Sequence, residues 1–204
     1  MWKTVPKVIF QSTGDPPRQS HVWRAADGER TPAARRRWYR QGADYLGLNP
    51  RWDGGLMGHH RGRVVHISDQ PLRIDVDCAL MPGKRRLDQC FWLLEEGHDA
   101  YQEYVLEAIP QRSRPVRVGL SSTGLDGRYA LWSRPADFAA RVLERDEGLA
   151  LRLARGPFRR IDVNWLFSGV SCHVGCDMMD VPWSHVARAL ALSVDLVVAV
   201  EMCS

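Results

Sequence analysis

The stretch Leu72-Arg73-Ile74-Asp75-Val76-Asp77-Cys78-Ala79-Leu80 decides the fold class, because charged side chains occupy every second position from Arg73 to Asp77 in an otherwise apolar run. Side chains of a β-strand alternate between its two faces, so this pattern predicts a strand with one apolar face and with Asp75 and Asp77 together on the other. Their Cβ atoms would lie about 6.5–7 Å apart. Carboxylates at that spacing converge on one hard cation, or on two cations about 3.5–4 Å apart. Two like charges beside a core need compensation, so a metal ion, an arginine or a shared proton is expected next to them.

Length and composition indicate a soluble globular protein. The 204 residues are 45% hydrophobic and 25% charged, which is enough to bury a substantial core. We expect one compact domain over residues 1–204, with a basic N-terminal part (1–62) and a core that carries the motifs (63–204). The first residues lack the apolar stretch of a secretory signal, and the run Leu196–Val200 is too short to cross a bilayer, so no membrane association is expected. Five irregularly spaced cysteines favour the reducing cytoplasm.

The net charge is only +4, but the positive charge is clustered beside aromatic side chains. Guanidinium groups pair with phosphate, and aromatic rings stack on bases, so such clusters are typical of nucleic-acid binding. A solvated helix face is the alternative explanation. The side chains expected to contact nucleic acid are Arg35, Arg36, Arg37, Trp38, Arg40, Lys84, Arg85 and Arg86.

Periodicity and breaker residues give a coarse map of the chain. We expect a strand at Lys7–Phe10, a turn at Gly14–Pro17, and a helix that is capped by Thr31 and ends near Gly47. A glycine-rich passage with a loop at His59-His60 leads to a strand at Val64–Ile67. Further helices are expected at Leu87–Ile109 and at Ser133–Ala154, and a further strand is expected at Ile161–Phe167.

A hairpin is predicted over Asp162–Cys176, with its turn at Ser168-Gly169. In its second arm Ser171 and His173 share one face, and Cys172 faces the core as a small apolar side chain. A hydroxyl and an imidazole side by side beyond a tight turn can hold a phosphate oxygen.

The end of the chain is predicted to form a helix after Asp180 and Pro182, and then a strand at Val194–Val200. Asp195 is the lone acid in that apolar strand. Charged residues seldom occupy such places without a partner, so Asp195 is a third candidate for the acidic cluster that Asp75 and Asp77 begin.

Three motifs in this order resemble the catalytic signature of the archaeo-eukaryotic primase superfamily: Ile74–Asp77, Phe167–Val174 and Val194–Val198. The resemblance implies an α+β fold, with an RRM-like mixed or antiparallel sheet flanked by helices. It also implies a catalytic site in which two Mg²⁺ or Mn²⁺ ions are bound by carboxylates and the nucleotide triphosphate is held by hydroxyl, imidazole and guanidinium groups. The implied metal ligands are Asp75, Asp77 and Asp195, and the implied nucleotide-binding residues are Ser168, Ser171, His173, Arg159 and Arg160.

The expected activity is primer synthesis from nucleoside triphosphates on a single-stranded DNA template, with a helicase or another replication protein as a further candidate partner. In such a site, one cation lowers the pKa of the attacking hydroxyl and the other neutralises charge on the leaving pyrophosphate. Two alternatives stay open. The turn after Ser168-Gly169 is one residue shorter than in the family, which favours a non-catalytic nucleic-acid-binding module, and acids on strand ends also suit a metal-dependent phosphohydrolase. Cys78, Cys90 and His98 form no paired knuckle, so structural zinc is not expected.

Overall fold

The structure is a computed structural model of the chain. It describes residues 31–52, 54–69, 71–78, 89–96, 114–119, 124–125, 127–163, 169–175 and 181–203. The strand and turn expected at Lys7–Phe10 and Gly14–Pro17 lie outside these residues, as do Lys84, Arg85, Arg86, Ser168 and Asp180.

The first described element is the predicted basic helix, α1 (Pro32–Leu46). Thr31 caps it, because its side chain accepts a hydrogen bond from the amide of Ala34 at 3.2 Å, and Gly47 ends it in the left-handed region with φ 66°. Gly42 lies where the ring of Trp183 packs, and a Cβ at this position would lie 2.2 Å from that ring. A glycine is therefore required for α1 to dock against the C-terminal helix.

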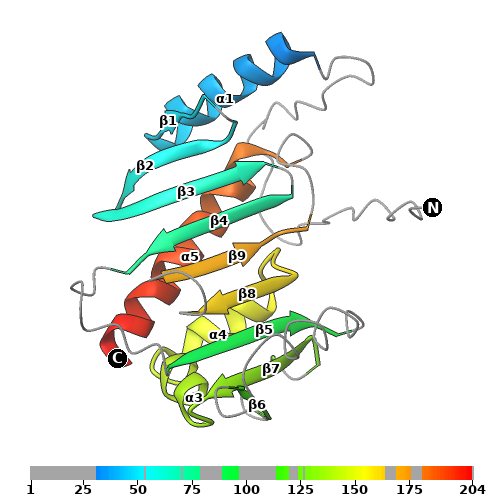
Figure 1. Cartoon of the computed structure of the whole chain (residues 1–204), viewed down its shortest axis with the longest axis vertical. Coiled ribbons are helices and arrows are strands. Elements are labelled where there is room, and N and C mark those ends of the chain that lie inside the picture. Colours follow the sequence, from blue (N-terminus) through cyan, green and yellow to red (C-terminus); the bar gives the residue numbers. More distant parts are fainter. Residues whose placement is uncertain are drawn as a thin grey trace.

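Nine strands in the described part form one antiparallel sheet in the order β1-β2-β3-β4-β9-β8-β5-β7-β6 (Figure 1). The strands are β1 (Asn49–Pro50), β2 (Leu56–His60), β3 (Arg63–Asp69), β4 (Leu72–Asp77), β5 (Cys90–Glu95), β6 (Val116–Val118), β7 (Tyr129–Arg134), β8 (Arg160–Val163) and β9 (Gly169–His173). The expected boundary between residues 62 and 63 falls inside the β2–β3 hairpin, so the residues described on its two sides share this sheet.

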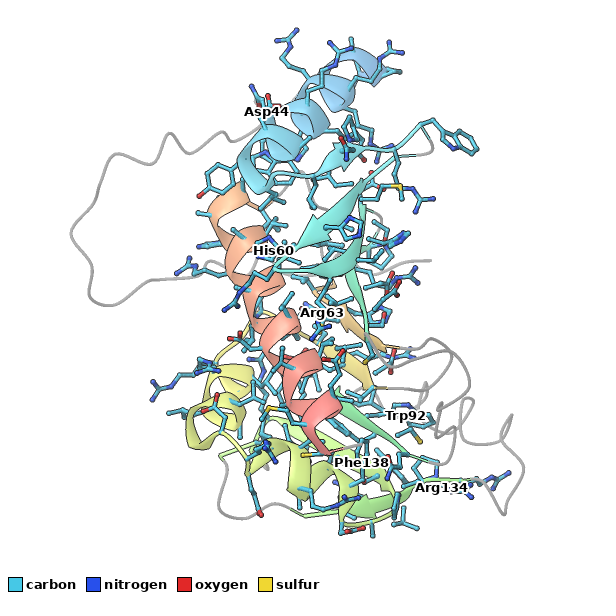
Figure 2. All side chains as sticks on the ribbon, turned by 90° about the vertical axis from the view of Figure 1, so that its left-hand side faces the viewer. Asp44, His60, Arg63, Trp92, Arg134 and Phe138 are labelled. Atoms are coloured by element: carbon cyan, nitrogen blue, oxygen red, sulfur yellow. The ribbon has the colours of Figure 1, made fainter. Side chains whose placement is uncertain are left out.

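The helices α1, α3 (Phe138–Leu143), α4 (Glu147–Ala154) and α5 (Trp183–Cys203) lie on one face of the sheet (Figure 2). Leu72, Ile74 and Val76 of β4 are buried in the core beneath them, as the alternation in the sequence predicts. Asp75 points to the opposite face, which we call the polar face. The described chain is therefore an α+β fold in which a helical layer covers one side of an antiparallel sheet. Among the described helices, none combines the length and apolar character that a bilayer crossing requires.

Three expected elements are wrong where the structure describes them. Cys90–Glu95, expected to be helical, is β5, and its first five side chains are all buried between β7 and β8, so no alternation marks it as a strand. The helix expected from Ser133 begins later and is divided into α3 and α4, because Ser133 belongs to β7. His59 and His60 belong to β2 and not to a loop.

The strand expected at Val194–Val200 is also wrong, because these residues continue α5. This helix packs against β4, β9, α3 and α4, so it buries more than one side. Val194, Leu196, Val197 and Val200 are all at most 2% exposed. The apolar run is therefore a buried helix rather than a buried strand.

Candidate functional site

The tetrapeptide Arg-Ile-Asp-Val occurs twice, at Arg73–Val76 in β4 and at Arg160–Val163 in β8. These two strands flank β9 on either side and pair with it in the same register. Ser171 therefore lies opposite both aspartates, and His173 lies opposite both arginines. The polar face thus carries an acid row (Asp75, Ser171 and Asp162) and, two residues along each strand, a basic row (Arg73, His173 and Arg160).

Hydrogen bonds join the two rows into one network. Arg73 Nε donates to Asp75 Oδ2 at 2.9 Å, and Arg160 Nε donates to Asp162 Oδ1 at 2.7 Å. Ser171 Oγ donates to Asp75 Oδ1 at 2.5 Å, which joins β9 to β4. His173 Nε2 lies 3.2 Å from Asp162 Oδ2 and 3.3 Å from Ser171 Oγ. The arginines provide the compensation that the sequence demands beside the acids.

The Ser171–His173–Asp162 contacts do not form a nucleophilic triad. In such a triad the histidine contacts the serine through one ring nitrogen and the carboxylate through the other. Here both contacts use Nε2. Ser171 donates its one proton to Asp75, so the imidazole of His173 does not receive it. The imidazole therefore does not activate the Ser171 hydroxyl as it would in a triad.

Asp77 lies two residues beyond Asp75 on the same strand and is exposed. Its neighbour across the ladder is Gly169, and a Cβ on that glycine would lie 2.1 Å from the carbonyl oxygen of Val76. A glycine is therefore needed for β9 to approach β4 here, and the partner strand places no side chain beside the Asp77 carboxylate.

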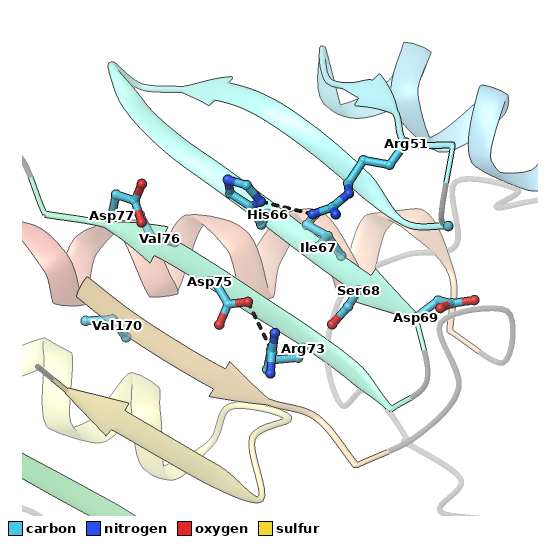
Figure 3. A pocket seen from close by; sticks show the side chains of 11 residues that line it. Arg51, His66, Ile67, Ser68, Asp69, Arg73, Asp75, Val76, Asp77 and Val170 are labelled. Atoms are coloured by element: carbon cyan, nitrogen blue, oxygen red, sulfur yellow. Dashed lines mark hydrogen bonds and ion pairs between the residues drawn. The ribbon is translucent and has the colours of Figure 1, made fainter. Parts of the chain in front are cut away.

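Asp75 and Asp77 line a hollow of about 480 Å³ on the polar face (Figure 3). Arg73 lines the same hollow from β4, His66 lines it from β3, and Arg51 lines it from the segment that follows β1. Among the described residues, no group of three or more His, Cys, Asp or Glu side chains gathers as a metal cluster. Two carboxylates are nevertheless the donor set for Mg²⁺ that is bound together with substrate phosphates. The residues present fit that mode of binding.

The expected convergence of Asp195 with Asp75 and Asp77 is wrong. Asp195 lies in α5 on the helical side of the sheet, where its Oδ1 is 2.9 Å from Arg61 Nη1 and its Oδ2 is 3.5 Å from Arg152 Nη2. The side chain of Asp75 points to the other side. The sequence pattern was ambiguous here, because an acid within an apolar run is compatible with a strand and with a helix. Since these residues form a helix, Asp195 lies outside the sheet.

The residues of α1 that are expected to contact nucleic acid divide into two groups. Arg36, Arg37 and Arg40 are exposed. Arg35 forms an ion pair with Asp69 at 2.7 Å, and the Trp38 ring lies 4.9 Å from that of Trp183. Arg35 and Trp38 therefore support the fold. The three exposed arginines keep the surface position that a contact with nucleic acid requires.

The two arginines expected at the nucleotide also differ in position. Arg160 belongs to the basic row, whereas Arg159 lies 3.8 Å from Glu95 and its stem packs where a Cβ on Gly175 would be. Arg159 therefore helps to hold β8 against β5.

Cys172 faces the core, as expected, and is fully buried behind the acid row. Burial raises the pKa of its thiol to about 12, and the nearby Asp162 and Asp75 act in the same direction. The thiol is therefore neutral and acts in packing.

Asp162 and Arg73 are the site residues that were not singled out from the sequence. The repeated Arg-Ile-Asp-Val tetrapeptide is the signal that identifies both of them, because the same residues at the same strand positions present the same side chains to one face.

Comparison of the chain with protein-family models, with curated proteins and with solved structures found no match.

Proposed function

We propose that the polar face binds a nucleoside triphosphate together with a divalent cation and joins nucleotides on a single-stranded DNA template, as in the primase superfamily with its RRM-like sheet. One observation carries the proposal. The Asp-Val-Asp strand and the Ser-Cys-His strand, which the resemblance assigns to one site, are adjacent, and Ser171 bonds to Asp75 across 96 positions of sequence.

The two rows separate the charges as a metal–nucleotide complex requires. Asp75 and Asp77 present hard oxygen atoms for the cation. Arg73, His173 and Arg160 present nitrogen donors from three neighbouring strands, which suit the oxygens of a triphosphate. A Mg²⁺ or Mn²⁺ ion held there would lower the pKa of the attacking hydroxyl and neutralise charge on the leaving pyrophosphate.

Each arginine of the basic row also pairs with an aspartate of the acid row. Arg73 forms an ion pair with Asp75 at 2.9 Å. A triphosphate that pairs with Arg73 frees this carboxylate for the cation, so nucleotide and metal are expected to bind cooperatively. Asp162 accepts from Arg160 and lies 3.2 Å from His173, so it orients this imidazole of the basic row toward the acid row. In this proposal Asp195 has no part in binding the metal or the nucleotide.

A nucleic-acid-binding module without catalysis is the second candidate. The observation in its favour is that both aspartates of the acid row are already paired with arginines at less than 3 Å. In this case the rows stabilise the sheet, and the exposed arginines of α1 provide the contacts with nucleic acid.

Incubating the protein with labelled nucleotides, a single-stranded DNA template and Mg²⁺ or Mn²⁺ tests the proposal. We expect short oligomers from the wild type and none from Asp75→Asn or Asp77→Asn, whereas the matched acid variant Asp195→Asn keeps its activity. Template binding without any product supports the binding module, and release of free phosphate without product supports a hydrolase.

A further inference from the structure

We propose that Asp162 is a positioning residue that holds the proton of His173 on Nε2, so that binding of a nucleotide takes up one proton at His173 Nδ1. This inference rests on the proposed function, in which His173 contacts the triphosphate, and assigns a protonation state to that contact. In the step, a buffer acid or a hydronium ion gives up its proton, and an N–H bond forms at Nδ1. The resulting imidazolium pairs with a phosphate oxygen.

The contacts of His173 decide which ring nitrogen carries the proton. Nε2 lies 3.2 Å from Asp162 Oδ2 and 3.3 Å from Ser171 Oγ. An ionised carboxylate only accepts hydrogen bonds, and Ser171 donates its one proton to Asp75 at 2.5 Å. Both groups that face Nε2 are therefore acceptors, so Nε2 is the donor. A neutral imidazole in this position has no proton on Nδ1.

Asp162 is itself held in one place. The residue is 8% exposed, and its Oδ1 accepts from Arg160 Nε at 2.7 Å, while its Oδ2 faces His173. The two carboxylate oxygens thus have separate partners on two neighbouring strands. A carboxylate that contacts one nitrogen of an imidazole sets the tautomer and the orientation of the ring. Asp162 therefore acts on a ligand through His173 and does not contact the ligand itself.

Nδ1 is the ring nitrogen of His173 that remains for a ligand. Within the part of the chain that the structure describes, both polar contacts of the ring use Nε2, and the side chain is 22% exposed. Triphosphate oxygens are negatively charged acceptors, so an unprotonated Nδ1 repels them and a protonated Nδ1 donates to them. A triphosphate that contacts this nitrogen therefore selects the imidazolium and draws a proton from solution.

The charged groups around His173 come from the two strands that flank β9 (Figure 1). Arg73 of β4 and Arg160 of β8 lie directly opposite His173, and both disfavour a third positive charge. Asp162 favours that charge through its direct contact. Asp75, two residues along β4 from Arg73, acts in the same direction from farther away. A bound triphosphate adds negative charge beside the whole basic row, which shifts this balance toward the imidazolium.

Titration calorimetry with ATP and non-reactive Ca²⁺, at about pH 7.5 in buffers of different ionisation enthalpy, counts the protons taken up on binding. We expect the wild type to take up at least about half a proton per ATP. His173→Gln should lose this uptake, Asp162→Asn should lose most of it, and the matched acid variant Asp195→Asn should keep it. ¹⁵N NMR of the wild type needs no variant of Asp162. It should show the His173 proton on Nε2 in the free protein and protons on both ring nitrogens in the ATP complex.

A His173 proton on Nδ1 in the free protein, or equal proton uptake by the wild type and His173→Gln, would overturn the inference. ATP that binds without any uptake would also overturn it and would leave the proposed function standing, because Nδ1 would then accept from a hydroxyl or amino group of the nucleotide. Uptake that depends on His173 without oligomers in Mg²⁺ or Mn²⁺ would keep the inference and reject nucleotidyl transfer. Absence of ATP binding would overturn both.

Discussion

Replacing Ser171 with alanine removes the hydroxyl that joins β9 to Asp75. Ser171 is 5% exposed and donates to a carboxylate at 2.5 Å. Hydrogen bonds to charged groups contribute about 1.5–3 kcal/mol. The Asp75 side chain is 20% exposed, so solvent weakens the bond in part, and we expect the variant to lose about 2 kcal/mol in the free energy of unfolding. For a chain of this length that lowers the Tm by about 4–8 °C. Urea unfolding and calorimetry at pH 7 measure both quantities.

Ser193→Ala is the matched control. Ser193 is fully buried, but its hydroxyl donates to a neutral acceptor, the Ala189 carbonyl, at 2.9 Å. We expect this variant to lose about 1 kcal/mol or less. A double-mutant cycle of Ser171→Ala with Asp75→Asn should show coupling of about 1 kcal/mol or more. Equal losses at the two serines, or no coupling, would refute the assigned bond.

Gly42→Val should lower the free energy of unfolding by about 1–3 kcal/mol, because the valine side chain would meet the Trp183 ring. Gly119→Ala is the control and should cost far less, because a Cβ at this position meets nothing within 4 Å. Urea unfolding of both variants tests the packing of α1. Burial raises the pKa of Cys172 to about 12, so the folded state retains a proton that the unfolded state loses from about pH 9. The free energy of unfolding should therefore fall as the pH rises from about 9 toward 12, and less steeply in Cys172→Ala; equal slopes would contradict the assignment. Asp146→Ala should cost about 1 kcal/mol at pH 7, because its carboxylate caps α4 by accepting from an amide at 2.9 Å. That hydrogen bond lowers the pKa of Asp146, so the difference from the wild type should shrink as the pH falls below about 4; an undiminished difference at pH 3 would refute the cap.

The two strands that carry the site were predictable because polar and apolar residues alternate along each of them in the sequence. Around Asp75, charged and apolar residues alternate, and only a strand separates them. In β9 and just beyond it, the polar residues Ser171 and His173 alternate in the sequence with the apolar residues Val170, Cys172 and Val174. Alternation reveals a face and not a neighbour, so the pairing of the two strands comes from the structure.

Asp195 and β5 show what local pattern leaves open. The last helix is buried along several sides, so its valines and leucines form a run that fits a strand equally well. β5 is buried on both faces, and its aromatic and aliphatic residues show no period of two. The β5 error arises because this strand has no solvated face, and the α5 error arises because only a narrow stripe of the helix, which includes Asp195 and Val198, is exposed within its apolar run. Asp162 was overlooked for another reason, since a single charged residue in a strand shows no alternation of acids and only the repeat of the Arg-Ile-Asp-Val tetrapeptide marks it.

The loss of the free-ion electron paramagnetic resonance signal of Mn²⁺ in the presence of nucleotide measures whether Asp75 and Asp77 bind the cation. We expect one nucleotide-dependent Mn²⁺ site that Asp75→Asn and Asp77→Asn each weaken by at least about tenfold, the equivalent of about 1.4 kcal/mol, and that Asp195→Asn leaves intact. Unchanged binding in the first two variants, or loss of binding in the third, would contradict it.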